Sequence, residues 1–173
     1  KVLDRLEAMQ LTAVAAVELE FYLVERDRPD GTPPKPAACR ETGRRPRNPS
    51  VYSLDELDSF SAVFHDISAA ASAQGIPTDT LITEHGPAQY EINLWHRPDA
   101  VLAADHAVMF KRAVKGVARR HGLEASFMAK PFGRSAGNGM HVHFSLTDRQ
   151  GRNVFDDGGL GSRTLRHAIG GLL

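Results

Sequence analysis

The chain has 173 residues, in which 21 lysines and arginines balance 21 aspartates and glutamates, and it contains one cysteine. Balanced charge argues against a general electrostatic attraction to nucleic acid or to an anionic membrane surface. A single cysteine excludes an internal disulfide framework, and the sequence has no Cys-x-x-Cys zinc pattern. Because no apolar run is long enough to cross a bilayer, we expect a cytoplasmic enzyme piece with one genuine core.

Both ends of the sequence predict a fragment of a longer protein. Apolar residues follow helical spacing at residues 1–9, yet no N-cap residue stands before them. Residues 162–173 begin a helix at Ser162 and stop on apolar residues. We therefore expect a domain that is truncated at both ends.

The first predicted strand, residues 17–23, carries two acids on one face. Side chains alternate along a strand, so Glu18 and Glu20 point to the same side, about 6.6 Å apart. The neighbouring positions on that face, Tyr22 among them, are mostly apolar. Like charges in a poorly solvated row raise one another's pKa unless a cation neutralises them. A divalent metal ion would supply that cation; a solvated strand face that carries two acids is the alternative.

Residues 26–50 hold six of the ten prolines and seven lysines or arginines. Such a stretch buries little apolar surface, so we expect a long mobile loop. Its arginines would steer a nucleotide or contact another subunit, unless the loop is a solvated insertion without a role. Cys39 within it is expected to be a loop thiol of no consequence.

Two helices are well marked in the middle of the chain. Residues 53–56, Ser-Leu-Asp-Glu, form a capping box, and apolar residues follow at helical spacing until Gly75 and Pro77. The second helix begins at Asp99 and closes with basic residues before Gly122.

Between these helices, Glu84 and Glu91 flank residues 85–88, which form a turn or irregular connection between two strand ends. Clean alternation then places Glu91 and Asn93 on one face, and this makes Glu91 the stronger candidate ligand. Glu84 either reaches the same cleft or belongs to the turn. His85 is expected at the surface or outside the ligand shell.

The last chemical motif joins a glycine-rich loop to a strand. Residues 133–139 contain three glycines, which allow a backbone to approach a ligand closely and to present N–H groups to anionic oxygens. On the strand that follows, His141, His143 and Ser145 share one face. An enzyme that handles phosphate and a metal needs such a pattern. An ordinary half-buried strand after a structural turn is the alternative.

The order strand, helix, strand, strand, helix, strand, strand predicts an α+β fold. We expect a mainly antiparallel sheet with helices packed on one face and polar side chains lining a cleft on the other. Acids and imidazoles that face one cleft indicate a divalent-metal site. Oxygen ligands with few imidazoles suit Mg²⁺ or Mn²⁺.

Three blocks of this sequence resemble the glutamine synthetase family, most closely its gamma-glutamylpolyamine (gamma-glutamylputrescine) synthetase branch. They are Glu18-Leu19-Glu20-Phe21, residues 84–91, and residues 130–145 with Gly-Met-His-Val-His-Phe-Ser at their end. The resemblance implies a partial glutamine synthetase-type catalytic domain over residues 1–173, without the family's N-terminal domain and without the C-terminal part of the catalytic domain.

The activity that the resemblance implies is an ATP-dependent ligase. It would join ammonia or a primary amine, with a polyamine such as putrescine favoured, to the γ-carboxylate of glutamate through γ-glutamyl phosphate. The full-length parent would be a homo-oligomeric ring that uses Mg²⁺ or Mn²⁺, and the fragment alone would be inactive.

Roles for single residues also follow from the resemblance. One metal ion, beside the substrate and acceptor phosphate, would be held by Glu20, Glu84 and Glu91, and a second, beside the nucleotide phosphates, by Glu18 and His141. The expected ATP contacts are His143 and Ser145, and Gly137 would lend its backbone to the glutamate site.

Two positions depart from the family pattern. Ala136 stands where many members have asparagine, and this weakens the case for a side-chain contact to glutamate. Ala88 stands where the family usually has glycine before Gln89, and it tightens that turn. Two other functions remain open on the sequence alone: a zinc-dependent hydrolase built from His141, His143 and a glutamate, and a catalytically silent relative that keeps the fold as a structural or binding protein.

Overall fold

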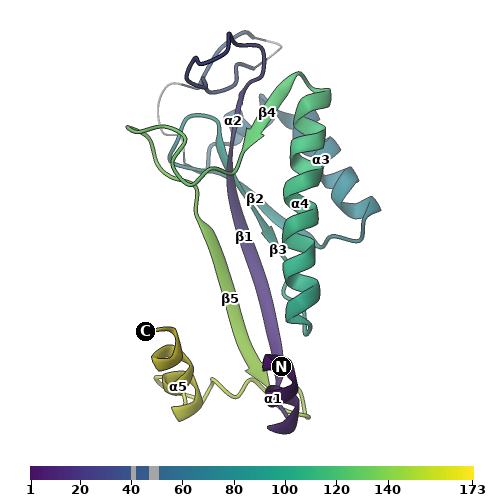
Figure 1. The fold of residues 1–173 in the computed structure, drawn as a ribbon. Coiled ribbons are helices and arrows are strands. Elements are labelled where there is room, and N and C mark those ends of the chain that lie inside the picture. Colours follow the sequence, from purple (N-terminus) through teal and green to yellow (C-terminus); the bar gives the residue numbers. More distant parts are fainter. Residues whose placement is uncertain (40–41, 47–50) are drawn as a thin grey trace. The chain divides into compact units, whose positions relative to one another are not determined.

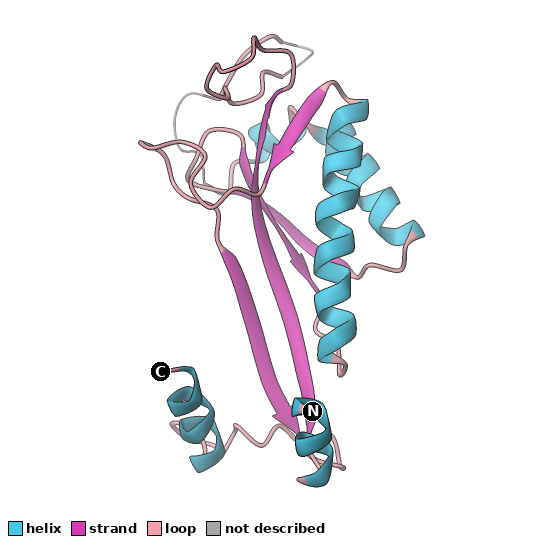
Figure 2. Cartoon of the chain, viewed as in Figure 1, coloured by secondary structure: helices cyan, strands magenta, loops and turns pink. Residues whose placement is uncertain are grey.

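The computed structural model describes residues 1–39, 42–46 and 51–173. Its elements, drawn in Figures 1 and 2, are α1 (Val2–Ala8), β1 (Thr12–Glu25), α2 (Leu54–Asp58), α3 (Ser61–Ala73), β2 (Thr78–Thr83), β3 (Gln89–Leu94), α4 (Ala100–Arg120), β4 (Leu123–Ser126), β5 (Met140–Thr147) and α5 (Arg163–Leu172). The chain divides into a central unit, residues 17–95 and 105–141, and a terminal unit, residues 1–16, 96–104 and 142–173.

The sheet is mainly antiparallel, as the sequence predicts. Its strands follow the order β2-β3-β1-β4, and β5 also pairs with β1. Along β1 and β3, Glu20 is paired with Glu91 and Tyr22 with Gln89. Directly opposed residues of antiparallel strands share a face, so these four side chains lie on one side of the sheet. Every second residue along β1 and β3 lies on that same side.

The opposite face of the central strands packs against helices. Leu19 and Phe21 of β1 and Tyr90 of β3 belong to one buried apolar cluster that includes Ile67 of α3 and Phe110 of α4. Figure 1 shows α3 and α4 beside the strands of this unit. Burial of each large side chain contributes about 1.5–3 kcal/mol, so this core fixes the strands on which the polar face depends. The expectation of an α+β fold with helices on one face is confirmed.

The predicted helix that begins at the capping box is two helices in the structure. Ser53 Oγ accepts a hydrogen bond from Glu56 N–H at 3.3 Å, which confirms the N-cap half of the predicted capping box. Ser53 N–H instead donates to Thr83 Oγ1 at 2.7 Å, and Glu56 Oε1 accepts from Ala88 N–H at 3.1 Å. Ser59 Oγ donates to Asp55 O at 2.8 Å, a local bond that competes with helix continuation. Phe60, with φ −124° and ψ 18°, leaves the helical conformation, and α3 starts after it.

Part of the proline-rich segment is attached to the sheet. Ala37 N–H donates to Leu23 O at 2.8 Å, and Pro36 forms a bridge with Val24. Ala37 and Cys39 are buried in the core. Residues 40–41 and 47–50 lie outside the described residues, and mobility of the segment stays a prediction.

In the terminal unit, Ser162 caps α5, as the sequence predicts, by accepting a hydrogen bond from Leu165 N–H at 3.1 Å. Phe144 and Phe155 meet edge to face with ring centres 5.7 Å apart. Within the described ranges, no helix has both the length and the apolar character that a membrane crossing requires.

Candidate metal centre

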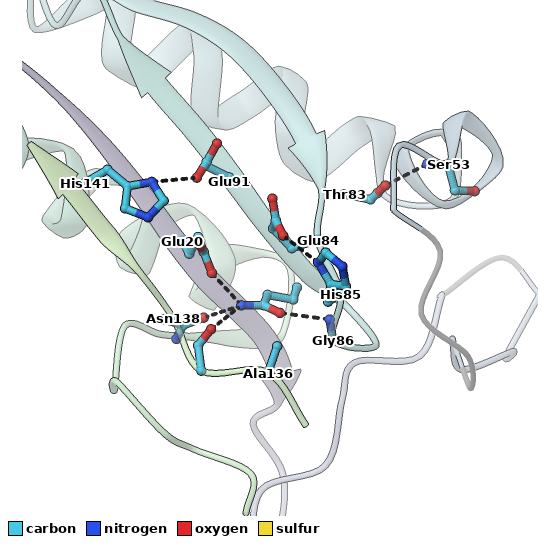
Figure 3. A network of polar contacts seen from close by, with 12 residues as sticks. Glu20, Ser53, Thr83, Glu84, His85, Gly86, Glu91, Ala136, Asn138 and His141 are labelled. Carbon is cyan, nitrogen blue, oxygen red and sulfur yellow. Dashed lines mark hydrogen bonds and ion pairs between the residues drawn. The ribbon is translucent and has the colours of Figure 1, made fainter. Parts of the chain in front are cut away.

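Three side chains from three strands meet on the polar face of the sheet. Glu18 comes from β1, Glu91 from β3 and His141 from the start of β5, and one potential ligand atom of each lies within 4.8 Å of the others. His141 Nδ1 is 2.9 Å from Glu18 Oε2 and 4.0 Å from Glu91 Oε2. Figure 3 shows the His141 ring directed toward Glu91, with Glu20 nearby. The sequence predicts this convergence, and the structure supplies the strand order and register that it requires.

Burial and neighbouring groups shift the pKa values of two residues in the cluster. Burial, followed by the charges of Glu18, Glu84 and Glu20, raises the pKa of Glu91 from 4.5 to about 7. A hydrogen bond to Glu18 is the main cause that raises the pKa of His141. Glu91 therefore keeps a proton up to about pH 7, which a bound cation would replace.

The donor set fits a hard divalent ion. It consists of carboxylate oxygens and one imidazole, a combination that Mg²⁺ and Mn²⁺ accept. Ligand atoms of Glu18, Glu91 and His141 lie within 4.8 Å of one another, so these groups are close enough to serve one ion or two adjacent ions.

Glu20 lies beside this cluster, and its position is restricted by Gly139. Glu20 N–H donates to Gly139 O at 3.2 Å. A Cβ at Gly139 would lie 2.7 Å from Glu20 Oε1 and 3.2 Å from His141 Nε2. Gly139 thus lets the loop backbone approach the carboxylate and the imidazole together. The predicted approach of this loop to a ligand stays a prediction.

Glu84 lies just before the turn that joins β2 to β3. Its backbone N–H donates to Gln89 O at 2.8 Å, and its carboxylate lies 3.4 Å from His85 Nδ1. Its charge contributes to the raised pKa of Glu91. Exposure of the His85 side chain is 70%, as expected for a histidine outside the ligand shell.

The remaining predicted residues have different surroundings. Gly137 packs tightly, because a Cβ there would lie 2.6 Å from Ala129 O. His143 and Ser145 lie further along β5, in the terminal unit, and the described cluster of metal-ligand atoms does not include them. A hollow of about 870 Å³ beside residues 42–46 and α2 contains none of the predicted site residues in its lining.

Two polar residues of the site were missed as functional candidates. Gln89 is fully buried and donates to Glu20, and Tyr22 OH donates to Ala136 O at 2.8 Å. Burial and the charge of Glu20 raise the pKa of Tyr22 to about 12, so its hydroxyl stays a donor. Gln89 shares strand alternation with Glu91 and Asn93, and Tyr22 shares it with Glu20, which is the signal that could have indicated both.

Comparison with known proteins identifies the family. The model of the glutamine synthetase catalytic domain matches residues 1–173. The gamma-glutamylputrescine synthetase PuuA of Escherichia coli (strain K12) is 39% identical over 171 residues, which are 98% of this chain and 36% of that protein. The glutamate–isopropylamine ligase of a Pseudomonas species is 34% identical over 160 residues, which are 90% of this chain and 33% of that protein.

Solved structures agree with this result. The structure titled "Apo GmaS without ligand" has a TM-score of 0.83 and 35% identity, and the match covers 99% of this chain and 39% of that one. The chain spans about a third of the length of the curated relatives it matches. By its sequence, its fold and its cluster of acids, the chain belongs to the glutamine synthetase family, within the catalytic domain.

Proposed function

We propose that the protein carrying this chain is an ATP-dependent ligase that joins an amine to the γ-carboxylate of glutamate through γ-glutamyl phosphate. Family membership supports the ligase class over a zinc hydrolase. The observation that carries the proposal is the meeting of Glu18, Glu91 and His141, where burial and three neighbouring acids raise the pKa of Glu91. A single imidazole in that cluster also favours Mg²⁺ or Mn²⁺ over zinc.

The reaction explains why so many acids gather. A carboxylate that attacks a phosphoryl group brings two anions together, and bound divalent ions neutralise their oxygens and align them. In our proposal Glu20, Glu84 and Glu91 hold one ion, and Glu18 and His141 hold the second. Glu91 Oε2 lies 4.0 Å from His141 Nδ1, so the ligands of the first ion lie next to the ligands of the second. Each ligand must be deprotonated to bind, so metal binding would release the Glu91 proton.

The other roles complete the site. His143 and Ser145 would contact ATP, and Gly137 would lend its backbone to glutamate. Ala136 offers no side-chain amide there, so glutamate would depend on backbone groups of this loop. Those groups are restrained, since Tyr22 OH holds Ala136 O.

We propose a polyamine such as putrescine as the favoured acceptor and ammonia as the weaker one. The support is the printed name of the Escherichia coli relative, and the Pseudomonas relative is named for another primary amine. We also propose a homo-oligomeric ring for the full-length protein. Because the chain spans about a third of its relatives, we expect residues 1–173 alone to be inactive.

ATP-dependent phosphate release tests the proposal. The full-length protein would be assayed with glutamate and, in turn, putrescine, isopropylamine, ethanolamine and ammonia. We expect release that requires glutamate, an amine and Mg²⁺ or Mn²⁺, and that falls at least 100-fold in Glu20→Ala and Glu91→Ala, as loss of a metal ligand requires. Activity that survives both changes would overturn the assigned roles. Metal binding without turnover of any amine would favour the silent relative.

A further inference from the structure

The side-chain amide of Gln89 lies between the metal-site carboxylate Glu20 and the glycine loop. Its Nε2 is 2.8 Å from Glu20 Oε2, 2.9 Å from Gly137 O and 3.1 Å from Asn138 Oδ1. Figure 3 labels Glu20 and Asn138, and dashed lines mark their contacts with this amide. The Gln89 side chain is fully buried, so no water competes for these bonds.

The orientation of this amide is determined by its neighbours. Gly86 N–H donates to Gln89 Oε1 at 2.8 Å. Rotation of the amide by half a turn would point an oxygen at the Glu20 carboxylate and an NH₂ group at another N–H donor. Both contacts would be repulsive, so only one orientation satisfies the site. The bond to Glu20 is charge-assisted and therefore the strongest of the set.

Asn138 links the Gln89 amide to the end of β4 and to the residues that follow it. Its Nδ2 donates to Ser126 O at 3.0 Å and to Met128 O at 2.8 Å, and its backbone N–H donates to Ala129 O at 2.9 Å. Asn138 is thereby held in place, with Oδ1 directed to Gln89. The carboxylate of Glu20, the Gly137 carbonyl and the 126–129 segment thus form one hydrogen-bonded set.

We propose that Gln89 is a positioning residue that ties Glu20 to the glycine loop, so that metal affinity and glutamate binding depend on the same buried amide. This inference rests on the function proposed above. Gln89 occupies one oxygen of Glu20 and leaves Oε1, which faces Gly139, for an ion. Without the amide, Glu20 would rotate away from Glu91, and the Gly137 carbonyl would lose its fixed direction.

The experiment compares Gln89→Met with Thr83→Val in the full-length protein. Methionine keeps the volume of glutamine and removes all four hydrogen bonds. Thr83 is equally buried, but it pairs with Tyr90 on the core side of the sheet and its Oγ1 accepts from Ser53 N–H at 2.7 Å. Thr83→Val therefore controls for lost stability. Mn²⁺ binding is measured without substrates by the loss of the free-ion paramagnetic resonance signal, and KM for glutamate is measured separately from kcat.

Gln89→Met should raise the Kd for Mn²⁺ and the KM for glutamate about tenfold each, whereas Thr83→Val should change neither more than about twofold. Equal effects of the two variants, or unchanged Mn²⁺ affinity in a folded Gln89→Met protein, would overturn the inference. If Gln89→Met does not fold, Asn138→Ser tests it: Kd should rise at least about threefold, and an unchanged Kd would refute it. Native protein that binds no Mn²⁺ would instead refute the proposed function.

Discussion

Glu20 on β1 lies directly opposite Glu91 on β3, so two carboxylates face each other across an antiparallel pair. Like charges in this position destabilise a sheet, and burial of Glu91 increases the cost. Burial, followed by the charges of Glu18, Glu84 and Glu20, raises the pKa of Glu91 to about 7, so below that pH the metal-free protein reduces the repulsion by keeping Glu91 protonated. A bound cation would relieve it without that proton.

The stability of the metal-free protein should fall as the pH rises from about 4.5 to about 7. Glu91 has a pKa near 4.5 in an unfolded chain and about 7 in the folded one, so in this window only the folded state holds the proton. The difference between the two pKa values corresponds to about 3 kcal/mol, which solvent screening of this partly accessible site reduces to roughly 2 kcal/mol. His141, whose pKa is also raised, acts in the same direction. Urea unfolding at several pH values, with chelator present, measures the slope.

Glu91→Gln should remove most of this slope and make the metal-free protein more stable than the native one at pH 8. Mn²⁺ at a concentration near the native Kd should stabilise the native protein more than Glu91→Gln. A slope that is the same in Glu91→Gln and native protein would show that Glu91 does not hold the proton.

Metal addition should raise the melting temperature. An ion that binds only the folded state contributes about 2.7 kcal/mol at 100 times its Kd. We expect Mn²⁺ to raise Tm by several degrees above pH 7 and by little at pH 5, where Glu91 and His141 are protonated. Differential scanning fluorimetry, with Mn²⁺ or with chelator, measures the change in Tm at each pH. A Tm that does not respond to Mn²⁺ at any pH would contradict the site.

Gly139→Ala should weaken metal binding about tenfold and change stability by less than about 1 kcal/mol. Its Cβ would lie 2.7 Å from Glu20 Oε1, which must then move. Gly133→Ala is the matched control, because a Cβ at this position of the same loop meets nothing within 4 Å. Mn²⁺ titration and urea unfolding of both variants separate the two effects. Equal Mn²⁺ affinities of Gly139→Ala and Gly133→Ala would contradict this prediction.

Ala88→Gly should change the free energy of unfolding by less than about 0.5 kcal/mol, although Ala88 is fully buried. Ala88 has φ of 59°, which costs an alanine about 1 kcal/mol, and glycine removes that strain while losing a buried methyl group. Ala71→Gly, fully buried within α3, should cost at least about 1.5 kcal/mol. Urea unfolding measures the free energy of unfolding of both variants. Equal losses in Ala88→Gly and Ala71→Gly would mean that Ala88 carries no backbone strain.

Strand alternation alone predicts that Glu18 and Glu20 share a face, because alternation within one strand follows from backbone geometry. That Glu91 lies on the same face depends on how β3 pairs with β1. The register between the strands cannot be predicted from alternation. A shift of two residues keeps every side chain on its face, so the pairing of Glu20 with Glu91 could be known only from the structure.

The amide set around Gln89 could not be predicted in the same way. A neutral amide leaves no charge pattern, and its four partners come from three separate segments of the chain. The break after α2 was missed for a similar reason. Ser59 is compatible with a helix until its hydroxyl bonds Asp55 O, a local choice that apolar periodicity does not report.

Equilibrium Mn²⁺ binding to the native protein, to Glu91→Gln and to Glu25→Gln tests the central claim most directly. Glu25 lies on the same strand as Glu20 but pairs with Arg45, so it serves as the control carboxylate. We predict saturable binding that Mg²⁺ competes for, a Kd raised at least about tenfold in Glu91→Gln, and native affinity in Glu25→Gln. Equal affinities in the two variants, or no saturable binding by the native protein, would contradict the account.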